Sequence, residues 1–411
     1  MKHPLFVAAA VSSMAIAAVP AYAECGLPAG EISLLSNTHS SVQLVLDRLA
    51  ACEADGLTVS GNLNSEHATI QVPALSVAPA EYDVVIIANS SLTSLLTADL
   101  VRPLDDLIAE YGDQLAPHQL IKVDGETVAV AFMANAQHLF YRADILEEIG
   151  MEPPTSYEEV LAAAEAIRAA GIMENPLAAT MSGWSLGQEF VNMYLGMGGQ
   201  FFEPGSAESR VDVDLAVETL EILKDMTGYM NADYLTFNSD AILPYWQAGE
   251  VAMANLWGSQ SVNFDPATSP VPDIAAATHL AAAPTVGGNE APATTVWWDG
   301  FAIAKNVSDE QAALAFQAMM YGFSPEMAQE NPTAAVWLID GYEPTPAAAG
   351  VIASVTGGAP SYSMLPYMGL MHDGFSNNIA SYFTGQESAE QVVADAIRDY
   401  ETAAKQAGFL D

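Results

Sequence analysis

The sequence predicts an α/β fold in more than one domain, and three observations support this prediction. Strand-like and helix-like runs alternate along the first third of the chain, as in proteins with a largely parallel sheet. The run at 83–87, Asp-Val-Val-Ile-Ile, is typical of a strand that is buried on both faces. Finally, a chain of 411 residues, of which 51% are hydrophobic, exceeds the size of a usual single core.

The first α/β lobe begins with two strands, at 31–35 and 57–63, and 83–87 is the third. A helix behind the cap at Ser40 and Ser41 separates the first two strands. In doubly wound sheets, ligands bind beyond the carboxyl ends of the strands. We therefore expect ligand contacts in the polar loops after the first and third strands, although ordinary polar turns are the alternative. The candidates are Asn37, His39, Ser40, Asn89 and Ser90.

Helical patterns dominate the rest of the chain. A hairpin turn is expected at Asp124-Gly125, and residues 155–265 are mainly helical by periodicity. Strand-like runs return at 251–255 and 294–303, and an amphipathic helix is expected at 389–406.

The N-terminus has the pattern of a secretory signal peptide. A basic start precedes an apolar run to Val19, and an Ala-x-Ala site ends at Ala23. We expect a signal peptide at 1–23 and a mature, soluble periplasmic protein. A lipid anchor on Cys25 is the alternative, but it requires a small residue in place of Glu24. No later run approaches the ~20 apolar residues of a membrane span.

The two cysteines, Cys25 and Cys52, suit an exported chain. We expect a disulfide between the N-terminal strand and the end of the first helix, with two buried thiols as the alternative. Neither this pair nor the seven scattered His residues has the spacing of a metal site. We therefore expect no metal and no cofactor.

The charge balance excludes polyanionic partners. Eleven Lys and Arg against 51 Asp and Glu give a formal net charge of −40. This field repels nucleic acid and anionic membranes. The excess is spread along the whole chain, which favours solubility in a salty medium as its cause over a cationic substrate.

A series of motifs carries a family resemblance. Asp124-Gly125, Tyr141–Asp144, Gly150 and Pro153–Glu159 follow one another as in the pattern DG…Y-N-K-D…G…P-P-T-T-W-E-E. That pattern belongs to the family 1 extracellular solute-binding proteins, the maltose-binding-protein-like sugar receptors of ABC transporters, which this chain resembles over essentially its whole mature length. Further matches are Gly198–Phe202, Trp246–Met253, Trp257, Ala302-Ile303 and Phe323–Glu326.

The resemblance implies a two-lobed periplasmic-binding-protein fold, in which each lobe is a sheet flanked by helices and three hinge crossings join the lobes. We place the crossings near 131–135, 284–286 and 328–332. The expected N-terminal lobe is 24–132 with 285–330, and the C-terminal lobe is 133–284 with 331–411.

The resemblance also implies a function without catalysis. A neutral mono- or oligosaccharide would bind in the cleft between the lobes, and the closed protein would deliver it to the membrane subunits of an ABC importer. We expect a monomer.

Positions that match the family pattern identify aromatic residues that could stack on a sugar, although each could instead be buried in the hydrophobic core. Trp257 and Trp184 are the first two, and one of Tyr362 and Tyr367 is expected to complete the site. Asn135 and Gln137, near the first crossing, are weaker polar candidates.

The segment Trp297-Trp298-Asp299 departs from the family pattern, which usually has glycines there. Adjacent side chains on a strand face opposite ways, so at most one of the two tryptophans should enter the cleft. Asp299 can accept two ligand hydroxyls or act as a solvated turn residue.

Two rival functions follow from particular residues. Aromatic rings around Asp299 could hold a quaternary ammonium or polyamine ligand. More remotely, Gly183–Gly187 matches the G-x-S-x-G elbow of a secreted serine hydrolase, and Asp299 and His372 follow in the hydrolase order.

Overall fold

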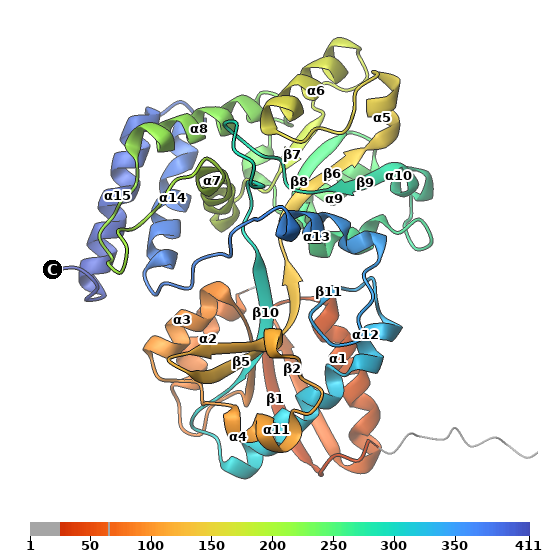
Figure 1. Ribbon diagram of the computed structural model, residues 1–411, viewed down its shortest axis with the longest axis vertical. Helices are drawn as coiled ribbons and strands as arrows, with labels where there is room; N and C mark the ends of the chain where they lie inside the picture. The colour runs from red at the N-terminus through yellow and green to blue at the C-terminus, as the bar shows by residue number, and fades with distance from the viewer. Residues whose placement is uncertain (1–24, 65) are drawn as a thin grey trace, which may run out of the picture.

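The computed structural model describes residues 25–64 and 66–411, and these residues form two lobes (Figure 1). Each lobe is a sheet with helices packed around it, as the sequence and the resemblance predict. The expected signal peptide at 1–23 lies outside the described residues. Within them, no helix combines the length and the apolar character needed to cross a bilayer.

The lower lobe in Figure 1 contains a seven-stranded sheet. Its strand order is β11-β5-β10-β3-β1-β2, and β4 pairs with β5. The strands are β1 Gly30–Ser36, β2 Leu57–Leu63, β3 Val84–Ala88, β4 Leu120–Val123, β5 Glu126–Asn135, β10 Trp297–Ile303 and β11 Val336–Trp337. The helices are α1 Ser40–Ala50, α2 His67–Leu75, α3 Asn89–Thr97, α4 Asp105–Tyr111, α11 Asp309–Gly322 and α12 Pro325–Glu330, with short 3₁₀ turns η1 Ala51–Asp55 and η2 Pro117–Gln119.

The upper lobe contains a four-stranded sheet of order β7-β8-β6-β9. Its strands are β6 Gln137–Arg142, β7 Leu177–Ala179, β8 Met253–Trp257 and β9 Thr278–Ala281. The helices are α5 Ala143–Glu148, α6 Tyr157–Ala169, α7 Trp184–Gly196, α8 Val213–Thr227, α9 Ser239–Gln247, α10 Pro272–Ala277, α13 Ala349–Thr356, α14 Met368–Phe383 and α15 Ala389–Gln406. Three 3₁₀ turns complete it: η3 Tyr234–Thr236, η4 Gly258–Phe264 and η5 Pro346–Ala348.

Strand β3 explains why the lower sheet is covered on both faces. Val84 and Ile86 belong to the core cluster that includes residues of α1 and α11. Val85 and Ile87 belong to a second cluster that includes residues of α2 and α3. The continuous apolar run therefore buries side chains on both faces, which confirms the prediction from its sequence.

The first crossing lies at Ala136. Strand β5 ends at Asn135 in the lower sheet, and β6 begins at Gln137 in the upper sheet. This position adjoins the predicted segment 131–135.

The second crossing lies later than the predicted 284–286. Thr285 accepts a backbone hydrogen bond from Tyr157 at 2.9 Å and donates one to Thr155 at 2.9 Å, which holds this segment on the upper lobe. Ala293 also belongs to the upper core, so the chain crosses just before β10 begins at Trp297.

The third crossing also lies later than the predicted 328–332. Trp337 of β11 and the nearby Ile339 are buried in the lower core. The chain reaches the upper lobe only where η5 and α13 begin. The lobe boundaries that we expected at 285 and 331 therefore both lie nearer to the C-terminus in the structure.

Cys25 and Cys52 form a disulfide, as the sequence predicts. It joins the segment before β1 to η1, and its two cysteines are 27 positions apart in the sequence.

Cross-linking a loop of this length lowers the conformational entropy of the unfolded chain, which raises the free energy of unfolding by about 3–4 kcal/mol. We expect Cys25→Ser/Cys52→Ser to lose free energy of unfolding of that order in a urea titration. The reduced wild type is the control and should match the variant; equal midpoints for the oxidised wild type and the variant would contradict the prediction.

Candidate ligand-binding site

Several strand ends meet at one edge of each sheet. In the lower lobe, β1 is parallel to β3, and β10 is antiparallel to both β3 and β5. The carboxyl ends of β1, β3 and β5 therefore share one edge, and β5 runs from it into the upper lobe. In the upper sheet, β8 is antiparallel to β6 and β7 is parallel to β8, so both end beside the start of β6. We call this region, where the two sheets approach each other, the interlobe edge.

Five rings form a contact group on the upper side of the interlobe edge. Trp297 meets Trp184 edge-on at 5.7 Å between ring centroids and Trp257 edge-on at 5.7 Å. Tyr362 packs on Trp297 at 4.1 Å, and His372 stacks on Trp184 at 4.2 Å. We call these five residues the aromatic group.

The aromatic group has an exposed layer and a supporting layer. Trp184 is 41% exposed and Trp257 is partly exposed, whereas Trp297, Tyr362 and His372 are buried. The two partly exposed indoles are therefore the surfaces that can stack on a ligand, and the buried rings hold them in place.

His372 supports Trp184 through a defined hydrogen-bond pattern. Its Nε2 lies 2.9 Å from the Trp184 carbonyl oxygen, which can only accept, so Nε2 carries the proton. Its Nδ1 then accepts from the Tyr362 hydroxyl at 3.1 Å. Burial lowers the pKa of His372 to about 4, which keeps the ring neutral. The sequence singled out His372 only as a hydrolase residue and gave no signal for this role.

Trp297 and Trp298 face different lobes, as strand alternation predicts. Trp297 is 5% exposed and packs in the upper core, whereas Trp298 packs against a lower-lobe cluster. The backbone N–H of Trp298 donates to Asn89 Oδ1 at 2.8 Å. Trp297 is therefore the member of the pair that belongs to the aromatic group.

Asp299 pairs with Ala88, the last residue of β3, and so lies at the interlobe edge. Part of the residue reaches solvent, yet the surrounding protein removes most water from the carboxyl group, and this burial raises its pKa to about 7. Among the described residues, none donates a hydrogen bond to this carboxylate. Its acceptor atoms are thus free for a ligand.

The loop after β1 places polar groups on the lower side of the interlobe edge. His39 caps α1 by accepting the Ser41 N–H at Nδ1, 3.3 Å away, and Ser40 is exposed in the first turn. His39 Nε2 is buried without a hydrogen-bond partner among the described residues, and burial lowers its pKa to about 4. Asn37 accepts a hydrogen bond from Ser36 at 3.1 Å, and Ser90 is exposed at the start of α3.

Two predicted polar contacts are engaged within the protein. Asn89 is buried, and besides binding the Trp298 N–H it donates to the carbonyl oxygens of Val296 and Tyr362, each at 3.4 Å. Asn135 accepts the Ala136 N–H at 3.0 Å. Both side chains fix the backbone around the crossings, and a contact of either with the ligand stays a prediction.

Tyr367 does not join the aromatic group. It is buried against Phe202 and Phe409, and its hydroxyl donates to the Ser206 carbonyl at 2.8 Å. Of the two tyrosines that the sequence offered, Tyr362 lies in the group, and it is a buried support.

The arrangement does not fit a serine hydrolase. Ser185 lies in the first turn of α7, and both ring nitrogens of His372 are occupied by Trp184 and Tyr362. A nucleophile needs a hydrogen bond to its general base. Since Ser185 has no such bond to His372, the hydrolase alternative is wrong.

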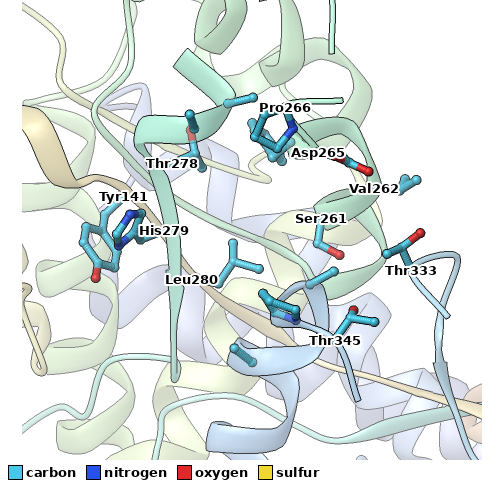
Figure 2. A pocket seen from close by; sticks show the side chains of 16 residues that line it. Tyr141, Ser261, Val262, Asp265, Pro266, Thr278, His279, Leu280, Thr333 and Thr345 are labelled. Atoms are coloured by element: carbon cyan, nitrogen blue, oxygen red, sulfur yellow. The ribbon is translucent and has the colours of Figure 1, made fainter. Parts of the chain in front are cut away.

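A cavity of about 540 Å³ lies beside β9 of the upper lobe, and Figure 2 shows the side chains that line it. Its lining includes Tyr141, Ser261 and Leu280 of the upper lobe, with Thr333 and Thr345 from the segments around β11 and the third crossing. Strands β9 and β11 lie beyond β6 and β5, away from β8 and β3. The cavity is therefore behind the hinge, and none of the candidate residues lines it.

Comparison with known proteins supports the fold. The maltose-bound MalE3 protein of T. maritima superposes with a TM-score of 0.76 at 17% identity, over 91% of this chain and 99% of that one. A solute-binding protein of Agrobacterium radiobacter K84 in complex with ribitol gives 0.76 at 18% identity, over 92% and 99%. The two-lobed periplasmic-binding-protein fold is thus confirmed.

Sequence comparisons identify the family. A "probable ABC transporter-binding protein" of Deinococcus radiodurans is 26% identical over 284 residues, which cover 67% of this chain. The chain spans 63% of the length of that relative. The family model "Bacterial extracellular solute-binding protein" matches residues 66–327, well over half of the sequence. This chain therefore belongs to the bacterial extracellular solute-binding proteins, a family of binding proteins rather than enzymes.

Proposed function

We propose that this protein is the solute-binding component of an ABC importer and binds a neutral mono- or oligosaccharide between its lobes. The observation that carries the proposal is the pair of partly exposed indoles, Trp184 and Trp257, at the interlobe edge. Flat aromatic surface suits the C–H faces of a sugar ring, and fixed polar groups suit its hydroxyls. Asp299, His39 and Ser40 supply such polar groups on the facing lobe.

The charges near the site favour a neutral ligand over an anion. The four cation–π contacts of the described residues involve Tyr321, Tyr229, Tyr382 and Phe383, none of which is in the aromatic group. His39 and His372 are held neutral by burial. Neither histidine therefore offers a counter-charge to an anionic solute, and the net charge of −40 would repel it.

We propose that the signal peptide at 1–23 is removed, that the mature monomer works in the periplasm, and that nucleic acid is not a partner. Solute binding would shift the lobes toward a closed state by rotation at the crossings. The membrane subunits of the importer would then bind this closed state. Solved structures of similar fold hold maltose, ribitol and D-mannitol, which supports the choice of solute.

The proposal is tested by a thermal-shift screen of residues 24–411 against monosaccharides, disaccharides, polyols, betaines and polyamines. A ligand at a hundred times its Kd stabilises the folded state by about 2.7 kcal/mol. We expect a shift with at least one sugar or polyol, confirmed by calorimetric titration. Shifts confined to the betaines and polyamines would replace this proposal by the quaternary ammonium or polyamine alternative, in which the Asp299 carboxylate pairs with the cation.

The pH dependence of binding separates the two ligand classes. A cation needs the ionised Asp299 carboxylate, so its affinity should fall about ten-fold per pH unit below about 7. A neutral sugar can bond to either form of the carboxyl, so its Kd should change less than about three-fold between pH 6 and pH 8. Asp299→Asn should remove the pH dependence of a cation and weaken a sugar by at most about ten-fold. Calorimetric Kd values of both proteins across this range check the prediction, and a steep dependence for a sugar would contradict it.

A further inference from the structure

A buried chain of hydrogen bonds runs from Trp297 into the upper lobe. The Trp297 indole N–H donates to the Thr295 hydroxyl at 2.9 Å, and that hydroxyl donates to Asn192 Oδ1 at 2.9 Å. The Asn192 amide donates to Gln137 Oε1 at 2.6 Å, and the Gln137 amide donates to Glu189 Oε1 at 2.8 Å. Each donor points toward the carboxylate, so we call this series the Glu189 chain.

Glu189 is a buried carboxylate without a cationic partner among the described residues. Besides Gln137, it accepts from the Thr180 hydroxyl at 2.6 Å and from the Asn255 amide at 2.9 Å. Burial raises the pKa of Glu189, and the three donors oppose that shift. A buried carboxylate that loses its donors is left unpaired at a large cost, so it holds those donors in position.

The Glu189 chain connects the segments that carry the three tryptophans. Glu189 and Asn192 lie on α7, which begins at Trp184. Asn255 lies on β8, two positions before Trp257. The Glu189 chain itself ends on the Trp297 indole.

The Glu189 chain also reaches the upper-lobe ends of two crossings. Gln137 is the first residue of β6, directly after the crossing at Ala136. Thr295 precedes the start of β10, where the second crossing lies. When the lobes rotate at these crossings, the Glu189 chain therefore holds the upper-lobe end of each crossing in place.

We propose that Thr295 and Glu189 are positioning residues for the solute site. They hold the Trp297 indole in one orientation, and its edge-on contacts then orient Trp184 and Trp257 toward the ligand. They also join the ends of two crossings into one rigid unit with α7. This proposal rests on the proposed function of solute binding and adds the residues that set its affinity.

Thr295→Val tests the proposal because valine keeps the shape of threonine and removes the hydroxyl. It leaves the Trp297 N–H without its acceptor, and Asn192 Oδ1 keeps only the hydrogen bond that it accepts from the Gln188 amide. We expect the Kd for the sugar found in the screen to rise at least ten-fold and the near-UV circular dichroism of the tryptophans to weaken. Thr295→Ser keeps the hydroxyl and should bind within about three-fold of the wild type.

Thr219→Val is the matched control. Thr219 is equally buried in the same lobe, but its hydroxyl donates to the Leu215 carbonyl at 2.8 Å on α8, outside the Glu189 chain. We expect its Kd and near-UV spectrum to match those of the wild type. A purely structural role of Thr295 would lower the melting temperature of both valine variants alike and leave both Kd values unchanged.

Glu189→Gln provides a second variant that keeps the size of the side chain. Its new amide can donate to Asn255, whose Oδ1 has no hydrogen-bond partner among the described residues and can turn to accept. We therefore expect a smaller rise of Kd, about three- to ten-fold. Glu218→Gln, at an exposed position on α8, should bind as the wild type does.

Two results would overturn the proposal: a wild-type Kd in Thr295→Val, or an unchanged near-UV spectrum in that variant. If the wild type binds none of the screened solutes, the proposed function fails. The near-UV spectra would then still decide whether Thr295 orders the tryptophans, so the two failures are distinguishable.

Discussion

Replacing both Trp184 and Trp257 by alanine should abolish measurable solute binding. Each indole offers ring surface at the interlobe edge, and truncating an aromatic contact of this kind costs about 2 kcal/mol of binding free energy. No ring contact joins the two indoles, but they share Trp297 as a partner, so the sum of the two losses is an approximate figure. About 4 kcal/mol corresponds to a rise of Kd by roughly a thousand-fold.

Calorimetric titration of the double variant with the sugar from the screen checks this result, and each single variant should lose roughly thirty-fold. Tyr229→Ala is the control because Tyr229 bonds to Leu177 at the start of β7, whereas the interlobe edge lies where β7 ends. Its Kd should stay within about three-fold of the wild type. If the double variant binds within ten-fold of the wild type, the two indoles do not form the solute site.

Trp297→Ala should strongly lower the stability of the upper lobe. The indole is buried among Trp184, Trp257 and Tyr362, and its N–H bond to Thr295 would be lost. Truncating a buried tryptophan to alanine costs about 3–5 kcal/mol. We expect a loss of that order in the free energy of unfolding, measured by urea titration, together with loss of solute binding.

Trp298, the neighbour of Trp297, supplies the control for this stability measurement. Trp298 is only half-buried, so Trp298→Ala should cost clearly less than Trp297→Ala. Equal losses for the two variants would show that Trp297 is not the centre of a packed aromatic group. A stable Trp297→Ala protein with unchanged solute affinity would contradict both the packing argument and the proposed site.

The sequence was sufficient for the features that depend on local pattern. The apolar run at 83–87 predicted a strand buried on both faces, because such a run has no solvent side. Alternation along a strand predicted that Trp297 and Trp298 point apart. Which of them faces the upper lobe could not be predicted, since it depends on the register in which Trp297 pairs with Asn135.

Long-range contacts decide the features that the sequence alone could not predict. Asn89 looks like a ligand contact in the sequence, but its partner, the Trp298 N–H, lies 209 positions away. Tyr367 follows Tyr362 by five residues, yet Phe202 and Phe409 place it in another part of the core. The second crossing, which was placed from the family resemblance, lies later than predicted because Thr285 is bonded to the upper lobe.

The position of β10 has a consequence for how the protein folds. In the lower sheet β10 lies between β3 and β5, which both precede the entire first part of the upper lobe in the chain. The lower sheet therefore stays split until almost three quarters of the chain has been made, and its central pairing must close a long loop. Pairings of this kind slow folding. A chain whose lower lobe completes late remains unfolded for longer, which would suit the export that we propose for this protein.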